Sequence, residues 1–222
     1  MSETVLVVAA HPDDETLGCG GTLLRHAAAG DTLHWLIVTA MTSPAFNAER
    51  IVRRNDEIEQ VASAYGFAGI HQLGFATTRL DTIPDADMVA AMSAVFATVK
   101  PGVVYLPFRG DVHSDHRKTF ATAYSCTKSF RHPYVRRVLM MEALSESEFA
   151  PALPGETFVP NVYRDISTEL ERKIDILRMY QGEVAAAPFP RSVEIVRAQA
   201  TFRGAVAGCM AAEAFMLLKD VA

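Results

Sequence analysis

Apolar residues occur along this chain in short blocks that alternate with longer amphipathic segments. A continuous apolar run at residues 5–10, rich in valine, favours a strand that is buried on both faces. We expect further strands at residues 32–38, 70–73, 103–106 and 138–142, and helices at residues 15–29, 47–65, 85–100 and 115–128. Candidate N-caps of the later helices are Asn47, Asp85 or Asp87, and Ser114 or Asp115. The repeated strand–helix order predicts an α/β fold, with a mainly parallel sheet covered by helices on both faces.

The alternation loosens after residue 142. Residues 143–160 contain three prolines and a glycine, which predicts a loop over the surface. Further helices are expected at residues 167–180 and 192–206, with a proline-rich break at 188–190 between them. Residues 210–218 form an apolar element of open type, which fits either a subunit contact in a homo-oligomer or a cover for the sheet edge. Because we find no repeat, low-complexity tract or linker, we expect a single domain over residues 1–222.

Composition narrows the class of protein. Half of the 222 residues are apolar and 21% are charged, as in soluble globular domains with a sizeable core. The net charge of −5 argues against a nucleic-acid or anionic-membrane binder. No apolar segment approaches the roughly 20 residues that span a bilayer, and the N-terminus lacks the basic start of a signal peptide. With only three widely spaced cysteines (Cys19, Cys126 and Cys209), we expect a cytoplasmic protein with reduced thiols and no membrane insertion.

Two polar clusters follow the first and fourth predicted strands. Residues 10–15 read AHPDDE, and residues 111–117 read DVHSDHR. In the common strand order 3-2-1-4-5, strands one and four are neighbours, and ligands bind beyond their carboxyl ends. Either cluster alone could be a turn in which a carboxylate caps the next helix. Because both clusters lie at neighbouring strand ends, we expect them to face each other and to form a metal site.

The residue types suggest how this site would work. A catalytic zinc site needs three nitrogen or oxygen ligands and one open position, which His11, Asp14 and His116 would provide. The metal would acidify a water molecule, and Asp13 would take the proton as the water attacks a carbonyl carbon. His113, if protonated, would stabilise the oxyanion or protonate the leaving amine.

Neighbouring residues refine this interpretation. Asp111 or Asp115 could hydrogen-bond a histidine ring and fix its tautomer. Histidine and carboxylate ligands suit zinc and also iron(II). The glycine-rich stretch at residues 18–21 lies inside the expected helix and not directly after the strand, so it does not fit a dinucleotide-binding motif. We interpret it as close packing of the helix on the sheet, or as room for a ligand.

The two clusters resemble those of the PIG-L/LmbE-like N-acetylglucosaminyl deacetylases. The similarity continues at residues 57–66 and 73–75, and at residues 188–192, 203–204 and 212–215. The resemblance implies a Rossmann-like fold and a zinc-dependent deacetylase acting on a small-molecule amino-sugar conjugate. It implies that His11, Asp14 and His116 are the metal ligands and that Asp13 is the general base. It also implies that His113 is the acid or oxyanion stabiliser, and that Arg54 and Arg191 contact the substrate.

The chain also departs from the family. Many members carry Pro-Asp-Gly where this chain has Ala76-Thr77-Thr78, so a sugar contact by that aspartate does not carry over. For Arg54, a solvated helix face or an ion pair with Glu57 is the alternative to substrate contact.

We expect removal of the N-acetyl group from an N-acetylglucosamine-type derivative, with release of acetate. The alternatives are a metal-dependent hydrolase of another amide or ester, including a phosphoester, and a non-catalytic sugar- or nucleotide-binding protein. The presence of both Asp13 and His113 gives no sign of lost catalysis.

Overall fold

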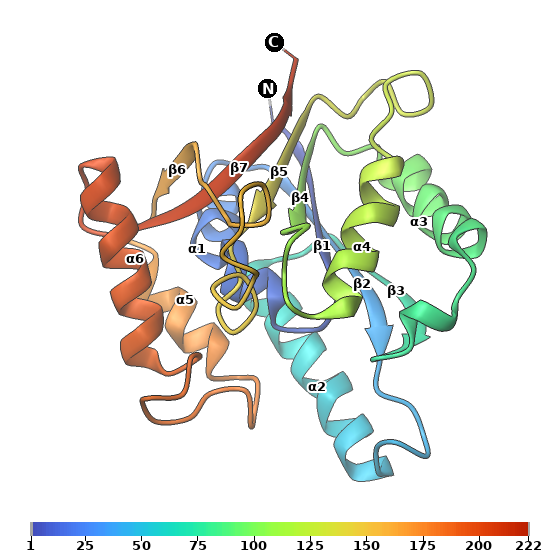
Figure 1. The fold of residues 1–222 in the computed structure, drawn as a ribbon, viewed down its shortest axis with the longest axis horizontal. Helices are drawn as coiled ribbons and strands as arrows, with labels where there is room; N and C mark the ends of the chain where they lie inside the picture. Colours follow the sequence, from blue (N-terminus) through green and yellow to red (C-terminus); the bar gives the residue numbers. More distant parts are fainter. Residues whose placement is uncertain (1, 222) are drawn as a thin grey trace.

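The structure is a computed structural model that describes residues 2–221 (Figure 1). Its strands are β1 Thr4–Ala9, β2 Thr32–Ala40, β3 Gly69–Ala76, β4 Val103–Pro107, β5 Arg137–Met141, β6 Val162–Asp165 and β7 Ala212–Asp220. Its helices are α1 Asp14–Ala28, α2 Ala48–Tyr65, α3 Asp85–Val99, α4 Ser114–Ser125, α5 Leu170–Leu177 and α6 Val193–Ala207, with a short 3-10 turn at Leu80–Thr82. None of the described helices is long and apolar enough to cross a membrane.

The described strands form one sheet in the order β3-β2-β1-β4-β5-β7-β6. The first five strands along the chain pair in parallel, and β7 pairs antiparallel with both β5 and β6. The predicted α/β fold with a mainly parallel sheet is therefore confirmed, including the order 3-2-1-4-5 of the first five strands. Strands β1 and β4 are neighbours, so the segments that follow them leave the sheet at the same edge.

Each central strand supplies side chains to two cores. In β1, Val5 and Val7 pack among residues of α1, α2, α5 and α6, whereas Leu6 and Val8 pack among residues of α3 and α4. This alternation follows from the two-residue period of a strand, and it explains why a sheet covered on both faces needs a continuous apolar run. Figure 1 shows α3 and α4 on one side of the central strands and α5 and α6 on the other.

The C-terminal part differs most from the sequence-based expectation. The apolar element of open type is strand β7, which fills the sheet between β5 and β6. Strand β6 was not predicted, because it has only four residues and none of them is fully buried. Helix α5 covers Leu170–Leu177 and is shorter than the predicted helix at residues 167–180.

The candidate caps of two helices, α3 and α4, are wrong. Pro84 precedes α3, so Asp85 and Asp87 lie in its first turn, where a negative charge still favours the helix dipole. Helix α4 is capped by His113, whose Nδ1 accepts a hydrogen bond from the backbone N–H of Asp115 at 3.1 Å. A residue expected to act only in catalysis therefore also begins a helix. The Asn47 cap of α2 is confirmed, with the Asn47 side chain accepting from the Arg50 N–H at 2.8 Å.

The glycines of α1 serve close packing. A Cβ atom at Gly18 would lie 2.6 Å from the Met141 side chain, and one at Gly21 would lie 2.7 Å from the Ile166 side chain. Of the two interpretations given for this stretch, close packing of the helix therefore accounts for these two positions. At Gly18, this packing brings α1 close to Met141, the last residue of β5.

A buried ion pair forms hydrogen bonds with the backbone groups at a kink in α1. The backbone leaves helical geometry at Cys19, which frees N–H and C=O groups in the middle of the helix. Glu213 of β7 accepts hydrogen bonds from the freed N–H groups of Gly21 and Thr22 at 2.9 and 2.7 Å. Lys173 of α5 donates to the Leu17 carbonyl at 2.9 Å and contacts Glu213 at 2.7 Å. The pair thus satisfies both sides of the break, as buried backbone groups require.

We expect Lys173→Met to lower the free energy of unfolding by about 3–5 kcal/mol, because it leaves the Glu213 carboxylate buried without its cation. Urea unfolding followed by circular dichroism measures this change. The matched control is Glu171→Gln, which removes an exposed ion pair with Arg197 and should leave the unfolding midpoint close to that of the wild type. A Lys173→Met protein as stable as the wild type would contradict the role given to the pair.

Candidate active site

The two polar clusters lie together at one edge of the sheet. The first follows β1 and continues into α1, and the second follows β4 and continues into α4. Because Val5 pairs with Val103 and Val7 with Tyr105, the two strands run side by side towards this edge. The expectation that the clusters face each other is met by this topology.

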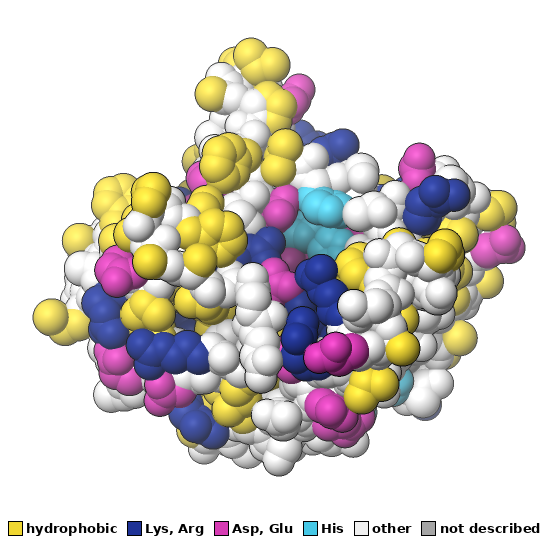
Figure 2. Space-filling view, turned by 90° about the horizontal axis from the view of Figure 1, so that it is seen from below, with side chains coloured by type: hydrophobic (Ala, Val, Ile, Leu, Met, Phe, Trp, Pro, Cys, Tyr) yellow, Lys and Arg dark blue, Asp and Glu magenta, His cyan; other side chains and the backbone are white. Residues whose placement is uncertain are grey.

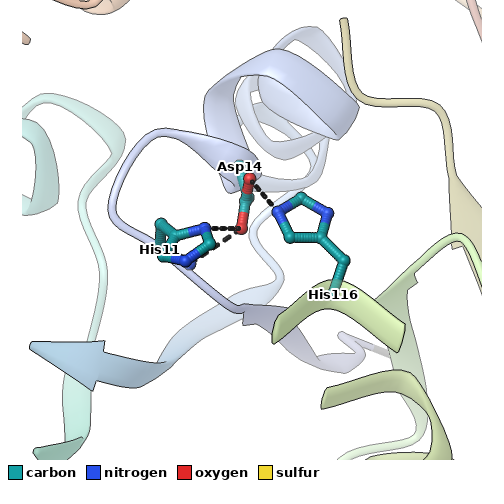
Figure 3. A group of neighbouring side chains, drawn as sticks. All are labelled: His11, Asp14 and His116. Carbon is teal, nitrogen blue, oxygen red and sulfur yellow. Dashed lines mark hydrogen bonds and ion pairs between the residues drawn. The ribbon is translucent and has the colours of Figure 1, made fainter. Parts of the chain in front are cut away.

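His11, Asp14 and His116 offer ligand atoms that all lie within 4.8 Å of one another (Figure 3). Nε2 of His116 is 3.2 Å from Oδ1 of Asp14. Nδ1 of His11 is 3.8 Å from the other oxygen, Oδ2, which also accepts a hydrogen bond from the His11 backbone N–H at 2.8 Å. Asp14 and His116 are buried, whereas His11 is partly open towards the cleft. Two imidazole nitrogens and one carboxylate oxygen form the donor set expected of a catalytic zinc or iron(II) site.

Two further carboxylates fix the rings of these histidines. Asp111 contacts Nδ1 of His116 at 2.8 Å, so Nε2 is the nitrogen that faces Asp14. Asp115 contacts Nε2 of His11 at 3.0 Å, which leaves Nδ1 facing Asp14. The Asp115 carboxylate is itself held by the backbone N–H of Thr78 at 2.7 Å. Carboxylates that orient ligand histidines in this way are a regular part of metal sites.

The charges of the cluster support one another. Burial acts to raise the pKa of Asp14, but the charge and hydrogen bond of His116 bring it below its usual range. Burial acts to lower the pKa of His116, but Asp14 and Asp111 together raise it well above its usual value. A cation is therefore strongly favoured between these two carboxylates.

Asp111→Asn should weaken metal binding by about 10- to 100-fold, because the amide no longer supplies a negative acceptor for His116 Nδ1–H. The dissociation constant can be measured by competition with a chromogenic chelator. Asp81→Asn, an exposed position, is the control for removing one negative charge from the chain. Unchanged affinity in Asp111→Asn would mean that the negative charge of Asp111 does not contribute to metal binding.

Asp13 is buried, and it is held in an unusual backbone conformation. Its φ of 128° lies in a region that residues other than glycine rarely adopt, and such strain is often found at functional sites. Its Oδ2 accepts a hydrogen bond from Arg191 at 2.7 Å. Burial raises the pKa of Asp13 well above its usual value, although Arg191 acts in the opposite direction. Asp13 thus lies beside Asp14 in the chain, but its side chain is paired with a different partner.

Arg54 and Arg191 both line the cleft, and their guanidinium groups are occupied by protein partners. Arg54 donates to the Pro12 carbonyl at 3.0 Å, pairs with Glu57 at 3.2 Å, and also pairs with Glu183. Arg191 contacts the second oxygen of Glu183 at 3.0 Å in addition to Asp13. Glu183 therefore bridges the two arginines, and the pair with Glu57 named as the alternative for Arg54 is present.

His113 lies against His11, with ring centroids 4.6 Å apart. Since its Nδ1 accepts the Asp115 N–H as the cap of α4, Nε2 carries the proton in the neutral ring. Burial, together with electrostatic contributions from the neighbouring His11 and His116, lowers the pKa of His113 to about 4. The sequence-based expectation considered His113 as a protonated group, whereas its surroundings favour the neutral ring.

The cleft opens above these residues and is visible in Figure 2 as a hollow where histidine side chains lie beside basic and acidic ones. One wall is apolar and comes from the end of β2, the loop that follows it and α2; it includes Met41, Phe46, Ile51 and Ile58. Thr77 and Thr78, which depart from the family pattern, lie in the same cleft. The cleft thus combines an apolar side with a polar floor, as binding sites for small molecules commonly do.

Sequence reasoning missed several polar residues of the site. Glu146 and Glu183 line the cleft, and Ser147 donates a hydrogen bond to Asp111 at 2.6 Å. Residues 143–147 had been assigned to a surface loop, yet four of these five residues are buried. The available signal was the polar sequence Ser145-Glu146-Ser147 just beyond the carboxyl end of β5, the neighbour of β4.

Comparison with known proteins agrees with this geometry. The family model described as PIG-L, GlcNAc-PI de-N-acetylase, matches residues 6–127, more than half of the 222 residues. The chain belongs to the PIG-L family. The sequence-based assignment to PIG-L/LmbE-like deacetylases is therefore confirmed, and with it the class of metal-dependent hydrolases of N-acetyl amide bonds.

Individual relatives of the PIG-L family are similar to this chain over nearly its whole length. The diacetylchitobiose deacetylase of Thermococcus kodakarensis is 24% identical over 98% of this chain and 84% of its own length. The structure of the N,N'-diacetylchitobiose deacetylase from Pyrococcus horikoshii superposes with a TM-score of 0.79, at 19% identity, covering 98% of this chain and 84% of that one. GalB, a 4-carboxy-2-hydroxymuconate hydratase from Pseudomonas putida, superposes with a TM-score of 0.77 at 18% identity, over 99% and 98% of the two chains. The same fold thus also occurs in a protein with another activity, so the reaction has to be argued from the site.

Proposed function

We propose that this protein removes the acetyl group from the nitrogen of an N-acetylated amino-sugar derivative of the N-acetylglucosamine type, releasing acetate and a free amine. The observation that carries the proposal is the convergence of His11, Asp14 and His116 on one point, with Asp13 and His113 beside them at the floor of a cleft. The names of the family and of its relatives supply the substrate class. The partner is accordingly a small sugar conjugate.

The three converging side chains are suited to hold one divalent ion, zinc or iron(II). When bound, such an ion supplies Lewis acidity, which lowers the pKa of water from 15.7 to about 7 and polarises a carbonyl group. Asp111 and Asp115 orient the two histidines for this purpose. The site therefore has both the ligands and the supports that a metal-dependent hydrolase requires.

Asp13 and His113 supply the acid–base and electrostatic parts of the reaction. Arg191 occupies Oδ2 of Asp13, so the other oxygen accepts the proton of the attacking water. As the C–N bond breaks, this proton passes to the leaving nitrogen, which yields acetate and amine. His113, whose Nδ1 is engaged as a helix cap, donates Nε2–H to the oxyanion that forms on the acetyl carbonyl.

The contacts of Arg54 and Arg191 favour a positioning role over the substrate contact that the family resemblance implies. Both hold the backbone or side chains of the motif at residues 11–14, through Pro12 and Asp13, and both are anchored by Glu183. Both arginines still line the cleft. Their proposed contribution is therefore to hold Asp13 in its strained conformation.

The test is acetate release from a panel of N-acetylglucosamine conjugates, with the free amine measured in the same samples. We expect equal amounts of both products, loss of activity with a chelator, and recovery on adding zinc or iron(II). The panel also includes a simple ester, a phosphoester and an unsaturated carboxylic acid, because other hydrolyses and a hydration are the competing reactions. Turnover of one of these without acetate release, or binding of sugars without turnover, would replace the proposal.

A further inference from the structure

The turn after β5, residues 143–147, is built into the wall of the active-site cleft. Ser147 accepts a hydrogen bond from the Ala143 N–H at 3.0 Å and donates to Asp111 at 2.6 Å. The backbone carbonyl of Glu146 accepts from the Val112 N–H at 3.3 Å. The turn is thus tied to the loop that carries Asp111, which in turn orients His116. A side chain on this turn is held at a fixed place relative to the candidate metal ligands.

Glu146 is the member of this turn that faces the cleft. It is only 8% exposed, and its Oε2 is enclosed and accepts no hydrogen bond from any described residue. Its other oxygen, Oε1, lies 3.4 Å from the Ser145 hydroxyl and 3.6 Å from the Arg191 guanidinium. The cleft carboxylates of Asp13 and Glu183, in contrast, have Arg191 nitrogens at 2.7 and 3.0 Å.

A buried carboxylate oxygen without a donor is costly, because the group has lost its water without gaining a partner. The surrounding turn nevertheless holds it in place. Ser145 has a φ of 73°, a conformation unfavourable for serine, and its hydroxyl accepts a hydrogen bond from Arg191 Nε at 2.7 Å. Strain at Ser145 and an unsatisfied acceptor at the neighbouring Glu146 are features that recur at ligand-binding sites.

We propose that the carboxylate of Glu146, which lines the cleft and has only weak partners in the protein, accepts a hydrogen bond from a ring hydroxyl of the bound amino sugar and so determines which sugars are accepted. This inference rests on the function proposed above and adds a specificity-determining residue to it. A neutral hydroxyl is the fitting donor, because a hydrogen bond to a carboxylate is stronger than one between neutral groups and brings no further charge into the cleft. A site that hydrogen-bonds a hydroxyl also rejects analogues that lack it, since the protein group is then left unpaired.

The experiment combines variants with deoxy substrates. The wild type, Glu146→Gln and Glu146→Ala are assayed with the best N-acetylated sugar of the panel and with analogues lacking one ring or exocyclic hydroxyl each. For Glu146→Ala we expect kcat/KM on the parent sugar to fall by about 10- to 100-fold, mainly through KM. With the wild type, kcat/KM on one deoxy analogue should be lower than on the parent sugar by a similar factor. On that analogue, Glu146→Ala should lower kcat/KM little further, which is the coupling expected of a direct contact. Glu146→Gln keeps the shape of the side chain and one acceptor, so its kcat/KM on the parent sugar should lie between those of the wild type and Glu146→Ala.

Three controls make the result decisive. Glu156→Gln, an exposed carboxylate outside the catalytic cleft, should leave the kinetics unchanged. Metal content should be the same in all variants; loss of metal from Glu146→Ala would assign Glu146 to the metal and overturn the proposal. If the alanine variant does not fold, the nearly isosteric glutamine variant is compared with the wild type in its place, with the smaller loss expected of it.

Different results would overturn the role of Glu146 and the proposed function. If the wild type releases acetate but the Glu146 variants reduce turnover of every deoxy analogue by the same factor as the parent sugar, Glu146 has no hydroxyl partner and only this proposal is overturned. If the wild type releases acetate from no conjugate of the panel, the proposed function and the role of Glu146 are both overturned.

Discussion

His116→Ala is expected to lose its bound metal and, with it, about 10³-fold or more of the acetate-releasing activity. The side chain supplies one of three converging ligand atoms, and the alanine leaves Asp14 and His11 to hold a divalent ion alone. Without the ion, water keeps a pKa of 15.7 in place of about 7, so little of it is reactive near neutral pH. Metal analysis of the purified protein and the acetate assay measure the two effects on the same samples.

The matched control is His71→Ala. His71 faces His34 on neighbouring strands of the sheet, outside the described cleft, so the variant removes an imidazole without touching the site. It should keep both metal and activity. Removal of His116 also leaves Asp14 and Asp111 close together without a cation, so we expect some loss of stability, which a thermal melt separates from loss of metal. A His116→Ala protein that keeps its metal and its activity would exclude the proposed ligand set.

The sequence allowed the central sheet to be predicted because its signals are local. Residues 5–10 are apolar without interruption, as a strand between two cores requires, and β1 supplies both cores. Asn47 and Gly66 mark the two ends of α2, through a side-chain cap and a left-handed backbone conformation. The order 3-2-1-4-5 then follows from general rules for α/β sheets.

The C-terminal part could not be derived in the same way, because its pairing is non-local. Strand β7 is placed by antiparallel pairing with β5, where Phe215 is opposite Met141. Nothing in a mainly apolar stretch of nine residues indicates that the strand reverses direction relative to the sheet. The same element carries Glu213, whose contacts with the kinked helix α1 and with Lys173 depend on three distant segments.

The residues of the candidate site also differ in whether local sequence patterns could predict their positions. His11, Asp14 and His116 could be predicted as neighbours, since each lies just beyond the end of a strand whose position was known. Glu146 and Arg191 could not be placed from local patterns, because one lies in a segment rich in prolines and the other in a loop beyond the regular alternation. The general consequence is that local patterns located the groups proposed for the chemistry, whereas the residues that orient them and shape the cleft required the three-dimensional structure.

Asp13→Asn should lower kcat by roughly 10²–10⁴-fold with little change in KM, the loss expected when a general base is removed. Asparagine has nearly the same shape and can remain beside Arg191, but it cannot take the proton from the attacking water. Because Asp13 is not among the three converging ligands, the variant should keep its full metal content, unlike His116→Ala. Steady-state kinetics together with metal analysis distinguish the two.

Variants of Arg191 test whether Asp13 acts as an isolated group or within the charge network. Arg191→Ala removes the partner of Asp13 Oδ2 and one anchor of Glu183, so kcat should fall by less than in Asp13→Asn. Arg191→Lys should recover part of the loss, because it restores a cation without the two-pronged geometry of a guanidinium. In the double variant Asp13→Asn/Arg191→Ala, the second change should add little, since a positioning residue has nothing left to position. Additive losses would instead mean that Arg191 contacts the substrate directly, the role that the family resemblance assigned to it.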